Sequence, residues 1–324
     1  MKKILFLSNN IPNNYDAGGI LYSNIIKQYG EECFFFISLV ETKNNLDCNI
    51  PYKRIINHYS IDIPSINIFF KILKKLSFIR TIYIFINLLR FREEITHSII
   101  NEKFDFIFAP LRGAVLLLLP YILKKTNLPL YAMVEDTVEA EFKDPYFVYT
   151  QKKKNYYELL SSVKSLGVAG QTMRDYFKTN YNIDSTILIP SFEKFTNSFP
   201  KLIDKEFNVF FAGNTYARKE LITFIKALEK LNLSSNIVVN FYVAAHIPFF
   251  SKSNKLTIIN VGWVTQKKLN EYMNKCHVSY LPYRMEPEFQ HQMKYAFPGK
   301  SGLYVSNNLP IFFTDQHTHL LILF

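Results

Sequence analysis

Cysteine, histidine and tryptophan are scarce in this 324-residue sequence, and the first two shortages exclude whole classes of protein. Its three cysteines, Cys33, Cys48 and Cys276, form no CxxC pair, and their odd number argues against a disulfide framework or a zinc cluster. The seven histidines are scattered, without metal-ligand spacing beside carboxylates. We therefore expect reduced thiols, a cytoplasmic location, and neither a metal nor another cofactor.

Acidic residues are also under-represented, with 27 Asp and Glu against 38 Lys and Arg. The formal charge of +11 favours an anionic partner, which could be a nucleotide-linked substrate, an anionic lipid surface or nucleic acid. Net charge alone does not show which of these three kinds of partner the protein binds. We expect no nucleic-acid binding, because the basic residues belong to no recognised nucleic-acid module.

The sequence has no apolar run long enough to span a membrane. The N-terminus is apolar for only four residues and then turns polar, which indicates a buried strand rather than a signal peptide. Residues 66–92 carry six Lys or Arg and no acid, but their longest uncharged run, 81–89, is far shorter than the roughly 18 residues that a spanning helix needs. This segment is either an interfacial helix on an anionic membrane or a core helix with a basic solvent edge.

Short apolar runs alternate with helical patterns along the first half of the chain, which is typical of a parallel sheet covered by helices on both faces. The predicted strands are 4–7, 34–39, 104–109, 130–134, 168–169 and 186–189. The predicted helices are 20–29, 69–99, 114–125, 152–165 and 172–180.

The alternation stops at a segment of mixed charge and then restarts, which indicates a second domain. The predicted strands there are 209–212, 238–243, 256–261, 278–282 and 311–313, with helices at 218–231, 265–275, 301–306 and a helix-like run at 318–323. We predict an α/β protein with two tandem Rossmann-like domains, 1–192 and 207–324, joined by a linker at 193–206. The second domain has fewer elements than a doubly wound domain normally has, so we expect it to be incomplete.

Two turns in the second half combine glycine with basic residues. A buried strand ends at Gly213, and the next helix begins at Arg218 and Lys219. Glycine permits a sharp turn, and a helix start offers free N–H groups, so this is a candidate anion site. At Pro298-Gly299-Lys300-Ser301, Lys300 is a candidate substrate clamp and Ser301 a candidate helix cap. Each turn, read alone, is also compatible with an ordinary helix start.

The order of these motifs resembles the C-terminal domain of GT-B glycosyltransferases, especially the large retaining group called family 4 or group 1. The resemblance implies two domains facing a central cleft. It also implies transfer of a sugar from a nucleotide-sugar donor to a glycan or lipid-linked acceptor in cell-surface polysaccharide synthesis. A lipid-linked acceptor favours the membrane interpretation of residues 66–92. The matching segments begin at Phe210-Phe211-Ala212-Gly213, Val261-Gly262-Trp263-Val264, Val278-Ser279-Tyr280-Leu281-Pro282 and Pro298-Gly299-Lys300.

The resemblance also implies roles for individual residues. Lys219, with Arg218 beside it, would bind the donor diphosphate and act in catalysis. The implied donor-binding residues are Gly213, Asn214, Tyr283, Lys300 and Ser301, together with Gly18 and Gly19 of a glycine-rich loop between the first strand and the first helix.

Carboxylates follow the predicted strand 130–134. Asp136, next to Glu135, could position an acceptor hydroxyl, and we include it among the catalytic candidates; a helix-capping role is the alternative. His246 follows a strand end and is either a residue of the cleft or an ordinary loop histidine.

Three positions depart from the family pattern. Asn214 replaces an arginine, Leu303 replaces a glutamate that binds the ribose hydroxyls, and Asn308 replaces a glycine, although asparagine tolerates left-handed geometry. These departures keep two alternatives open: a catalytically inactive GT-B-like scaffold, and a GT-B-fold epimerase of a nucleotide sugar.

Overall fold

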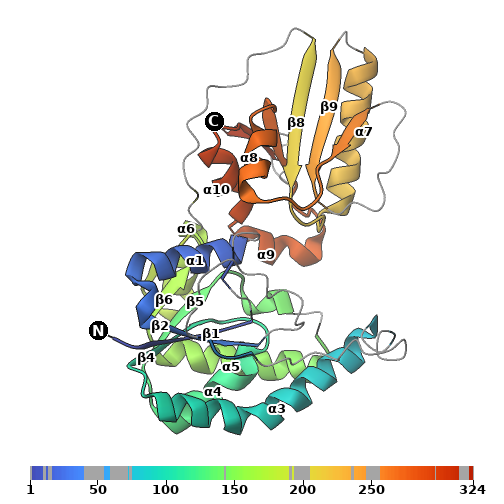
Figure 1. Cartoon of the computed structure of the whole chain (residues 1–324). Coiled ribbons are helices and arrows are strands. Elements are labelled where there is room, and N and C mark those ends of the chain that lie inside the picture. Colours follow the sequence, from blue (N-terminus) through green and yellow to red (C-terminus); the bar gives the residue numbers. More distant parts are fainter. Residues whose placement is uncertain are drawn as a thin grey trace. The chain divides into compact units, whose positions relative to one another are not determined.

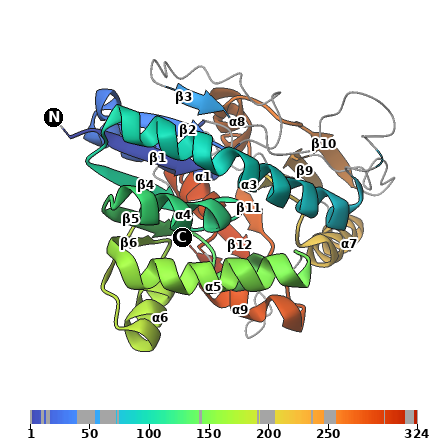
Figure 2. The ribbon, with the colours of Figure 1, turned by 90° about the horizontal axis from the view of Figure 1, so that it is seen from below.

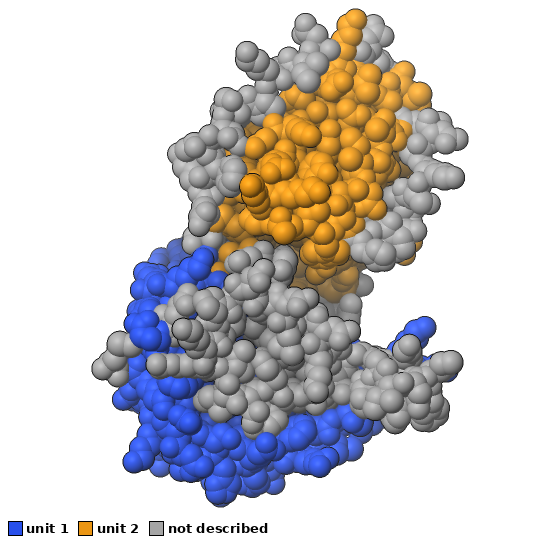
Figure 3. Space-filling view, viewed as in Figure 1, with its two compact units in different colours: residues 1–13, 21–189, 294–297 blue, residues 14–20, 190–293, 298–324 orange. Residues whose placement is uncertain are grey.

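Two compact units make up the chain (Figure 3). Unit 1 comprises residues 1–13, 21–189 and 294–297, and unit 2 comprises 14–20, 190–293 and 298–324. The computed structural model describes residues 2–9, 12–13, 17–39, 55–58, 72, 75–141, 144–189, 192, 205–234, 237–245, 256–295, 297–313 and 321–323. Most of the predicted linker 193–206 lies outside the described residues, and the predicted domain boundaries stay predictions.

Unit 1 contains a parallel sheet with the strand order β3-β2-β1-β4-β5-β6-β7 (Figure 1). Its strands are β1 (Ile4–Ser8), β2 (Phe34–Ser38), β3 (Ile55–His58), β4 (Phe106–Pro110), β5 (Leu130–Val134), β6 (Val163–Val168) and β7 (Ser185–Ile187). Its helices are α1 (Ala17–Tyr29), α3 (Ser77–Glu102), α4 (Val115–Thr126), α5 (Tyr146–Ser162) and α6 (Gln171–Tyr181), with 3₁₀ turns at Glu31–Cys33 and Val138–Glu141. The first four residues of α1 are grouped with unit 2.

Alternating side chains of the strands supply two separate cores, because successive residues of a strand point to opposite faces. Leu5 and Leu7 of β1 join the core formed with α3, α4, α5 and α6, whereas Ile4 and Phe6 pack with α1. Figure 2 shows α3, α4 and α5 together over one face of this sheet. The sheet is therefore covered on both sides, which explains why its inner strands β1, β4 and β5 are mostly apolar.

Unit 2 repeats this arrangement with the strand order β10-β9-β8-β11-β12-β13. Its strands are β8 (Glu206–Ala212), β9 (Val238–Ala244), β10 (Thr257–Asn260), β11 (Val278–Leu281), β12 (Ile311–Phe313) and β13 (Leu321–Leu323). Its helices are α7 (Arg218–Ser234), α8 (Gln266–Met273) and α10 (Gly299–Ser306), with a 3₁₀ turn at Pro287–Phe289. A short helix, α9 (Gln290–Tyr295), contributes residues to both units. All described pairings are parallel except β12 with β13.

The alternation along β8 determines which helix each side chain meets. Val209 and Phe211 pack with α7, and Phe210 and Ala212 pack with α8 and α10. Tyr304 of α10 is fully buried in the second of these clusters. Its hydroxyl accepts a hydrogen bond of 3.1 Å from the Ala212 N–H at the end of β8. This bond attaches α10 directly to the last residue of the strand.

The predicted fold class of two Rossmann-like α/β domains is confirmed, with local corrections. Residues 163–165 were predicted to end a helix, but they begin β6, because Val163 pairs with Leu130 of β5. The helix-like run 318–323 is also wrong where it is described: Leu321–Leu323 forms β13 beside β12. In both places strand pairing overrides the local pattern. Strand β3 and helix α9 were not predicted.

Among the helices in the described part of the chain, none is both long enough and apolar enough to cross a bilayer.

Replacing Tyr304 by Phe is expected to lower the free energy of unfolding by about 1–3 kcal/mol, because the buried Ala212 N–H would lose its acceptor. Urea denaturation measures the change. Tyr29 on α1 is 66% exposed, so Tyr29→Phe is the matched control and should change stability by less than about 0.5 kcal/mol. Equal losses in the two variants would contradict the role assigned to the Tyr304 hydroxyl.

Candidate anion-binding site

The strand order of unit 2 reverses between β8 and β11. From β8 the chain runs through α7 to β9 and β10, and it then returns to place β11 on the other side of β8. In open α/β sheets, ligands bind outside the carboxyl ends of the strands at such a reversal. Gly213 follows β8 and Pro282 follows β11, so both lie at this point.

Lys300 lies directly on Gly213. Gly213 has a φ of +90°, and a Cβ atom placed on it would be 2.6 Å from the Cε atom of Lys300. The Lys300 ammonium donates to the Asn214 carbonyl oxygen at 3.2 Å and lies 4.8 Å from the centroid of the Phe211 ring. The absent side chain of Gly213 therefore makes room for a cation above the turn that follows β8.

Burial changes the acidity of this cation. Desolvation of Lys300 lowers the pKa of its ammonium from 10.5 to about 7. The Tyr216 ring also lies close to the ammonium, with its centroid 5.3 Å away. An aromatic face attracts a cation, but it does not replace the hydration that burial removes. A bound anion would favour the protonated form of Lys300, so the site is suited to a negatively charged group.

The turn after Gly213 is held by contacts from the segment after β11. Arg284 donates from Nε to the Tyr216 carbonyl oxygen at 2.6 Å, and its guanidinium lies 4.0 Å from the centroid of the Phe289 ring. The Tyr216 hydroxyl donates to the Pro282 carbonyl oxygen at 3.0 Å. Tyr283, a predicted donor-binding residue, packs against the core cluster on the α10 side of the sheet. These contacts make the turn a supported structure rather than a free loop.

The basic pair at the start of α7 lies on the surface. The Lys219 side chain is 77% exposed, and its ammonium is 3.3 Å from the Glu286 carboxylate. The pKa of Glu286 lies below its ordinary value, first because its own backbone N–H donates to the carboxylate and then because Lys219 is near. Arg218 is exposed at the first residue of α7. Lys300, rather than Lys219, is the cation in contact with Gly213.

Helix α10 corrects one prediction about its start. Its N-cap is Pro298, so the expected capping role of Ser301 is wrong. The Ser301 hydroxyl and its backbone N–H both donate to the Pro298 carbonyl oxygen at 2.8 Å. Leu303 is buried in the core cluster with Phe210. Its apolar side chain therefore packs in the core at the position where the resemblance implies a ribose-binding glutamate. Asn308 has the expected left-handed φ, 52°.

The predicted glycine-rich loop is the first turn of a helix. Helix α1 begins at Ala17, so Gly18 and Gly19 are helical and do not belong to the loop before it. Neither glycine has a positive φ, so no left-handed turn requires them. The anion-binding role of this segment stays a prediction. Asp16 and His246 lie outside the described residues.

A second reversal of strand order, between β1 and β4, gathers polar groups in unit 1. Arg112, two residues after β4, donates from a terminal guanidinium nitrogen to Glu135, just after β5, at 2.7 Å. The Asn9 side-chain oxygen accepts from the Val115 N–H at 3.2 Å. Burial alone would lower the pKa of Arg112, but Glu135 and other neighbours outweigh it, so the pKa of Arg112 lies above its ordinary value and its guanidinium stays charged.

Asp136 is half-buried beside this pair and adds to the negative field on Arg112. The sequence pattern indicated Glu135 and Asp136 but not Arg112. An arginine after a strand does not by itself indicate a functional site. The position of Arg112 becomes informative because the strand order places β4 beside β1.

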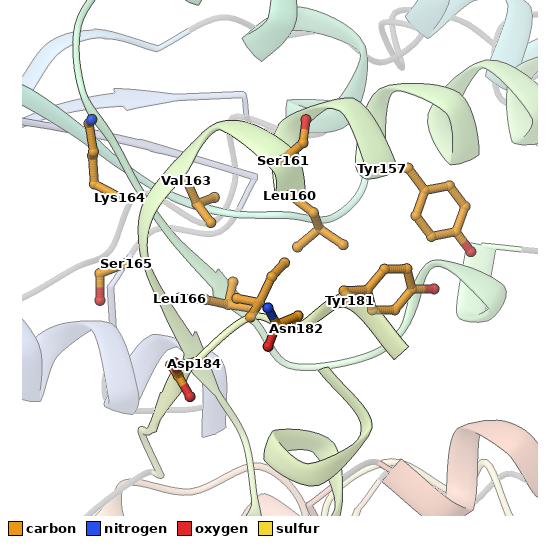
Figure 4. Close-up of a pocket in the computed structure, with 11 residues that line it drawn as sticks. Tyr157, Leu160, Ser161, Val163, Lys164, Ser165, Leu166, Tyr181, Asn182 and Asp184 are labelled. Carbon is orange, nitrogen blue, oxygen red and sulfur yellow. The ribbon is translucent and has the colours of Figure 1, made fainter. Parts of the chain in front are cut away.

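A separate cavity of about 620 Å³ lies in unit 1 at the amino ends of β6 and β7 (Figure 4). Tyr157, Tyr181, Lys164 and Asp184 are among its lining residues, and the two tyrosine rings stack with centroids 5.8 Å apart. None of the predicted site residues lines it. Among the described residues, no group of three or more His, Cys, Asp or Glu side chains is arranged to hold a metal ion.

Replacing Lys300 by Met is expected to remove a pH dependence of stability. The Lys300 pKa is lower in the folded chain than in the unfolded one, so the unfolded chain binds more protons between about pH 7 and 10.5, and stability rises with pH over that range. Below pH 7 the Met variant should be more stable than the parent by on the order of 1–3 kcal/mol, and this difference should shrink as pH rises.

Urea denaturation at about pH 6 and about pH 9.5 measures this change. Lys226→Met, at an exposed position of α7, is the control and should show no such trend. A constant difference between parent and Lys300→Met at the two pH values would contradict the lowered pKa of Lys300.

This chain resembles known proteins in its structure but not in its sequence. No known family model matches the sequence, and no curated protein is recognisably similar to it. Among solved structures, the chain is similar to an E. coli trehalose-6-phosphate structure bound with UDP-2-fluoro glucose, at 12% identity over 94% of this chain and 82% of that one, with a TM-score of 0.57.

Two further solved structures match this chain with similar sequence identity and TM-score. The apo form of the lipopolysaccharide outer core galactosyltransferase WaaB is 12% identical over 97% of this chain and 82% of its own, with a TM-score of 0.55. Arabidopsis thaliana UGT89C1 complexed with UDP-L-rhamnose is 14% identical over 86% and 74%, with a TM-score of 0.51. At these identities the likeness concerns the fold. The chain has the two-domain Rossmann-like fold of the GT-B glycosyltransferases.

Proposed function

We propose that this chain is a glycosyltransferase that moves a sugar from a nucleotide-sugar donor to a glycan or lipid-linked acceptor. The observation that carries the proposal is the position of Lys300 on Gly213, at the strand-order reversal of unit 2. The fold and the sequence motifs support the same activity. Its setting would be cell-surface polysaccharide synthesis.

The donor diphosphate would occupy the turn between Gly213 and α7. There, Lys300 is held at the turn, and Lys219 and Arg218 stand at the first residues of the helix. Fixed cations stabilise negative charge that grows on a leaving diphosphate. The exposed pair of Lys219 with Glu286 is no obstacle, because exposed ion pairs contribute roughly 0–1 kcal/mol and exchange readily for a more highly charged partner.

The proposed reaction retains the configuration of the sugar. The bond between the anomeric carbon and the donor phosphate breaks while the acceptor oxygen bonds to the same face of that carbon. The leaving phosphate takes the acceptor proton, so no protein nucleophile is required. In unit 1, Asp136 and the Glu135–Arg112 pair would position the acceptor hydroxyl. No metal or other cofactor forms part of this proposal.

A cytoplasmic location is part of the same proposal. Cys33 and Cys276 are buried free thiols, which is the usual state of cysteine in a reducing compartment.

A catalytically inactive GT-B protein is the second candidate, and Leu303 is the observation that favours it. Its buried side chain offers no acceptor for ribose hydroxyls. The two candidates differ in donor turnover. Isomerisation of a nucleotide sugar without any acceptor would instead identify an epimerase.

Nucleotide binding is expected to depend on Lys300. A panel of UDP, GDP, ADP and CMP, tested by thermal shift and then by calorimetry, should yield at least one ligand. Lys300→Met should weaken its binding about tenfold or more, because a charge-assisted contact is lost. Binding by the parent should also weaken as pH rises through about 7, where Lys300 loses its proton.

Lys226→Met is the control in this experiment and should bind the nucleotide like the parent, since Lys226 is an exposed residue of α7. If no nucleotide stabilises the parent chain, the active-enzyme proposal fails. If Lys300→Met binds as the parent does, the assigned site is wrong.

Turnover is expected to depend on Lys219. With the nucleotide sugar identified by binding, Lys219→Ala should reduce turnover about 10²-fold or more, because stabilisation of the leaving diphosphate is a large catalytic contribution. Release of nucleoside diphosphate measures the rate. A parent chain that binds nucleotide without any turnover would support the inactive alternative. Equal rates for the parent and Lys219→Ala would refute the role of Lys219.

A further inference from the structure

Helix α3 exposes apolar side chains along the outer face of its N-terminal half. Phe78, Ile79, Ile86 and Leu89 are 57%, 36%, 58% and 46% exposed. On a helix, positions 78, 79, 86 and 89 fall within about 100° of one another, so these side chains share one stripe. The stripe extends for about 17 Å along the helix axis, at 1.5 Å per residue.

The opposite face of α3 accounts for its packing in the domain. Leu88, Ile95 and Ile99 are buried in the core of unit 1, where α3 contacts α4. The core-helix interpretation therefore explains the inner face of α3 but leaves the outer stripe unexplained. Contiguous exposed apolar surface of this kind marks an interaction site in soluble proteins.

Helix α5 extends the same surface. At its first two residues, Tyr146 is 83% exposed and Phe147 is 47% exposed. The Phe147 ring meets Phe85 of α3 edge to face, with centroids 6.2 Å apart. Figure 2 shows α3 and α5 on either side of α4 over the same face of the sheet. We call the exposed side chains of these two helices the α3–α5 surface: Phe78, Ile79, Ile86, Leu89, Tyr146 and Phe147.

The exposed charge beside the apolar stripe of α3 is basic as far as Arg90. Residues 77–92 contain no acid; Lys75 is exposed just before α3, Arg90 is exposed on α3, and Lys154 is exposed on α5. The charge on α3 becomes acidic just beyond Arg90, where Glu93 and Glu94 are exposed. The apolar stripe thus ends where acidic residues begin.

The basic residues of segment 66–92 differ in where they lie. Lys71 and Lys74 lie outside the described residues. Arg92 turns toward α4, with its guanidinium 4.8 Å from the centroid of the Tyr121 ring. The exposed charge therefore comes from Lys75 and Arg90, at the two ends of the stripe, and from α5.

We propose that the α3–α5 surface docks on an anionic lipid bilayer, with α3 lying in the plane of the interface. An exposed helix face with apolar residues, an aromatic pair at its edge and basic flanks fits a lipid surface, because the apolar side chains enter the acyl boundary while Lys and Arg reach the headgroups. This docking is independent of the proposed glycosyl transfer. It would hold the chain at the surface where a lipid-linked acceptor resides.

Flotation of the full chain with vesicles tests the proposal. The parent should bind vesicles of phosphatidylcholine with about 30% phosphatidylglycerol at least tenfold better than vesicles of phosphatidylcholine alone, and added salt should weaken the binding. Ile86→Ser combined with Leu89→Ser should reduce binding about tenfold or more. Arg90→Glu should reduce binding several-fold and flatten its dependence on phosphatidylglycerol.

Matched controls come from exposed positions elsewhere. Leu233→Ser on α7 removes an apolar side chain that is 66% exposed, and Lys124→Glu on α4 reverses an exposed charge. Both should bind vesicles like the parent. The proposal is overturned if the parent binds neither vesicle, or if the controls lose as much binding as the α3–α5 variants. It is also overturned if the parent sediments as a dimer that Ile86→Ser with Leu89→Ser dissociates, because a second copy would then occupy the surface.

Discussion

The parallel pairing of β8 with β11 is the constraint on which the candidate site depends. Val209 and Phe210 lie opposite Val278 and Ser279, although almost seventy residues separate them in the chain. Because the strands run in the same direction, the turn after Gly213 and the segment after Pro282 emerge at one edge of the sheet. Tyr216 and Arg284 then join the two segments by hydrogen bonds.

The fold holds the Lys300 cation at the turn that follows β8. The missing side chain of Gly213 gives it space, and the Asn214 carbonyl and the Phe211 ring attract its ammonium. These contacts do not replace water completely, and the pKa of Lys300 falls accordingly. Lys219, in contrast, stays exposed and paired with Glu286. The two lysines therefore have different electrostatic characters: one is held and poorly hydrated, and the other is exposed and hydrated.

Local pattern predicted most of the fold, because buried parallel strands are continuous apolar runs and the helices between them have a clear period. It failed at Val163 and at Leu321, where pairing with a neighbouring strand decides the structure. For the site, the motif order singled out Gly213 and Lys300, but it gave no indication that they touch. Arg112 was missed because its importance depends on which strands are neighbours, and that information lies in the sheet order rather than in any short motif.

The low pKa of Lys300 has a thermodynamic consequence for any anion that binds beside it. Desolvation lowers the pKa of Lys300 toward neutral pH, whereas a bound anion favours the ammonium form. Binding would therefore draw a proton from the buffer. The heat recorded in a calorimeter would then contain the ionisation enthalpy of that buffer, so the apparent enthalpy would differ between Hepes and Tris even though the contacts are the same.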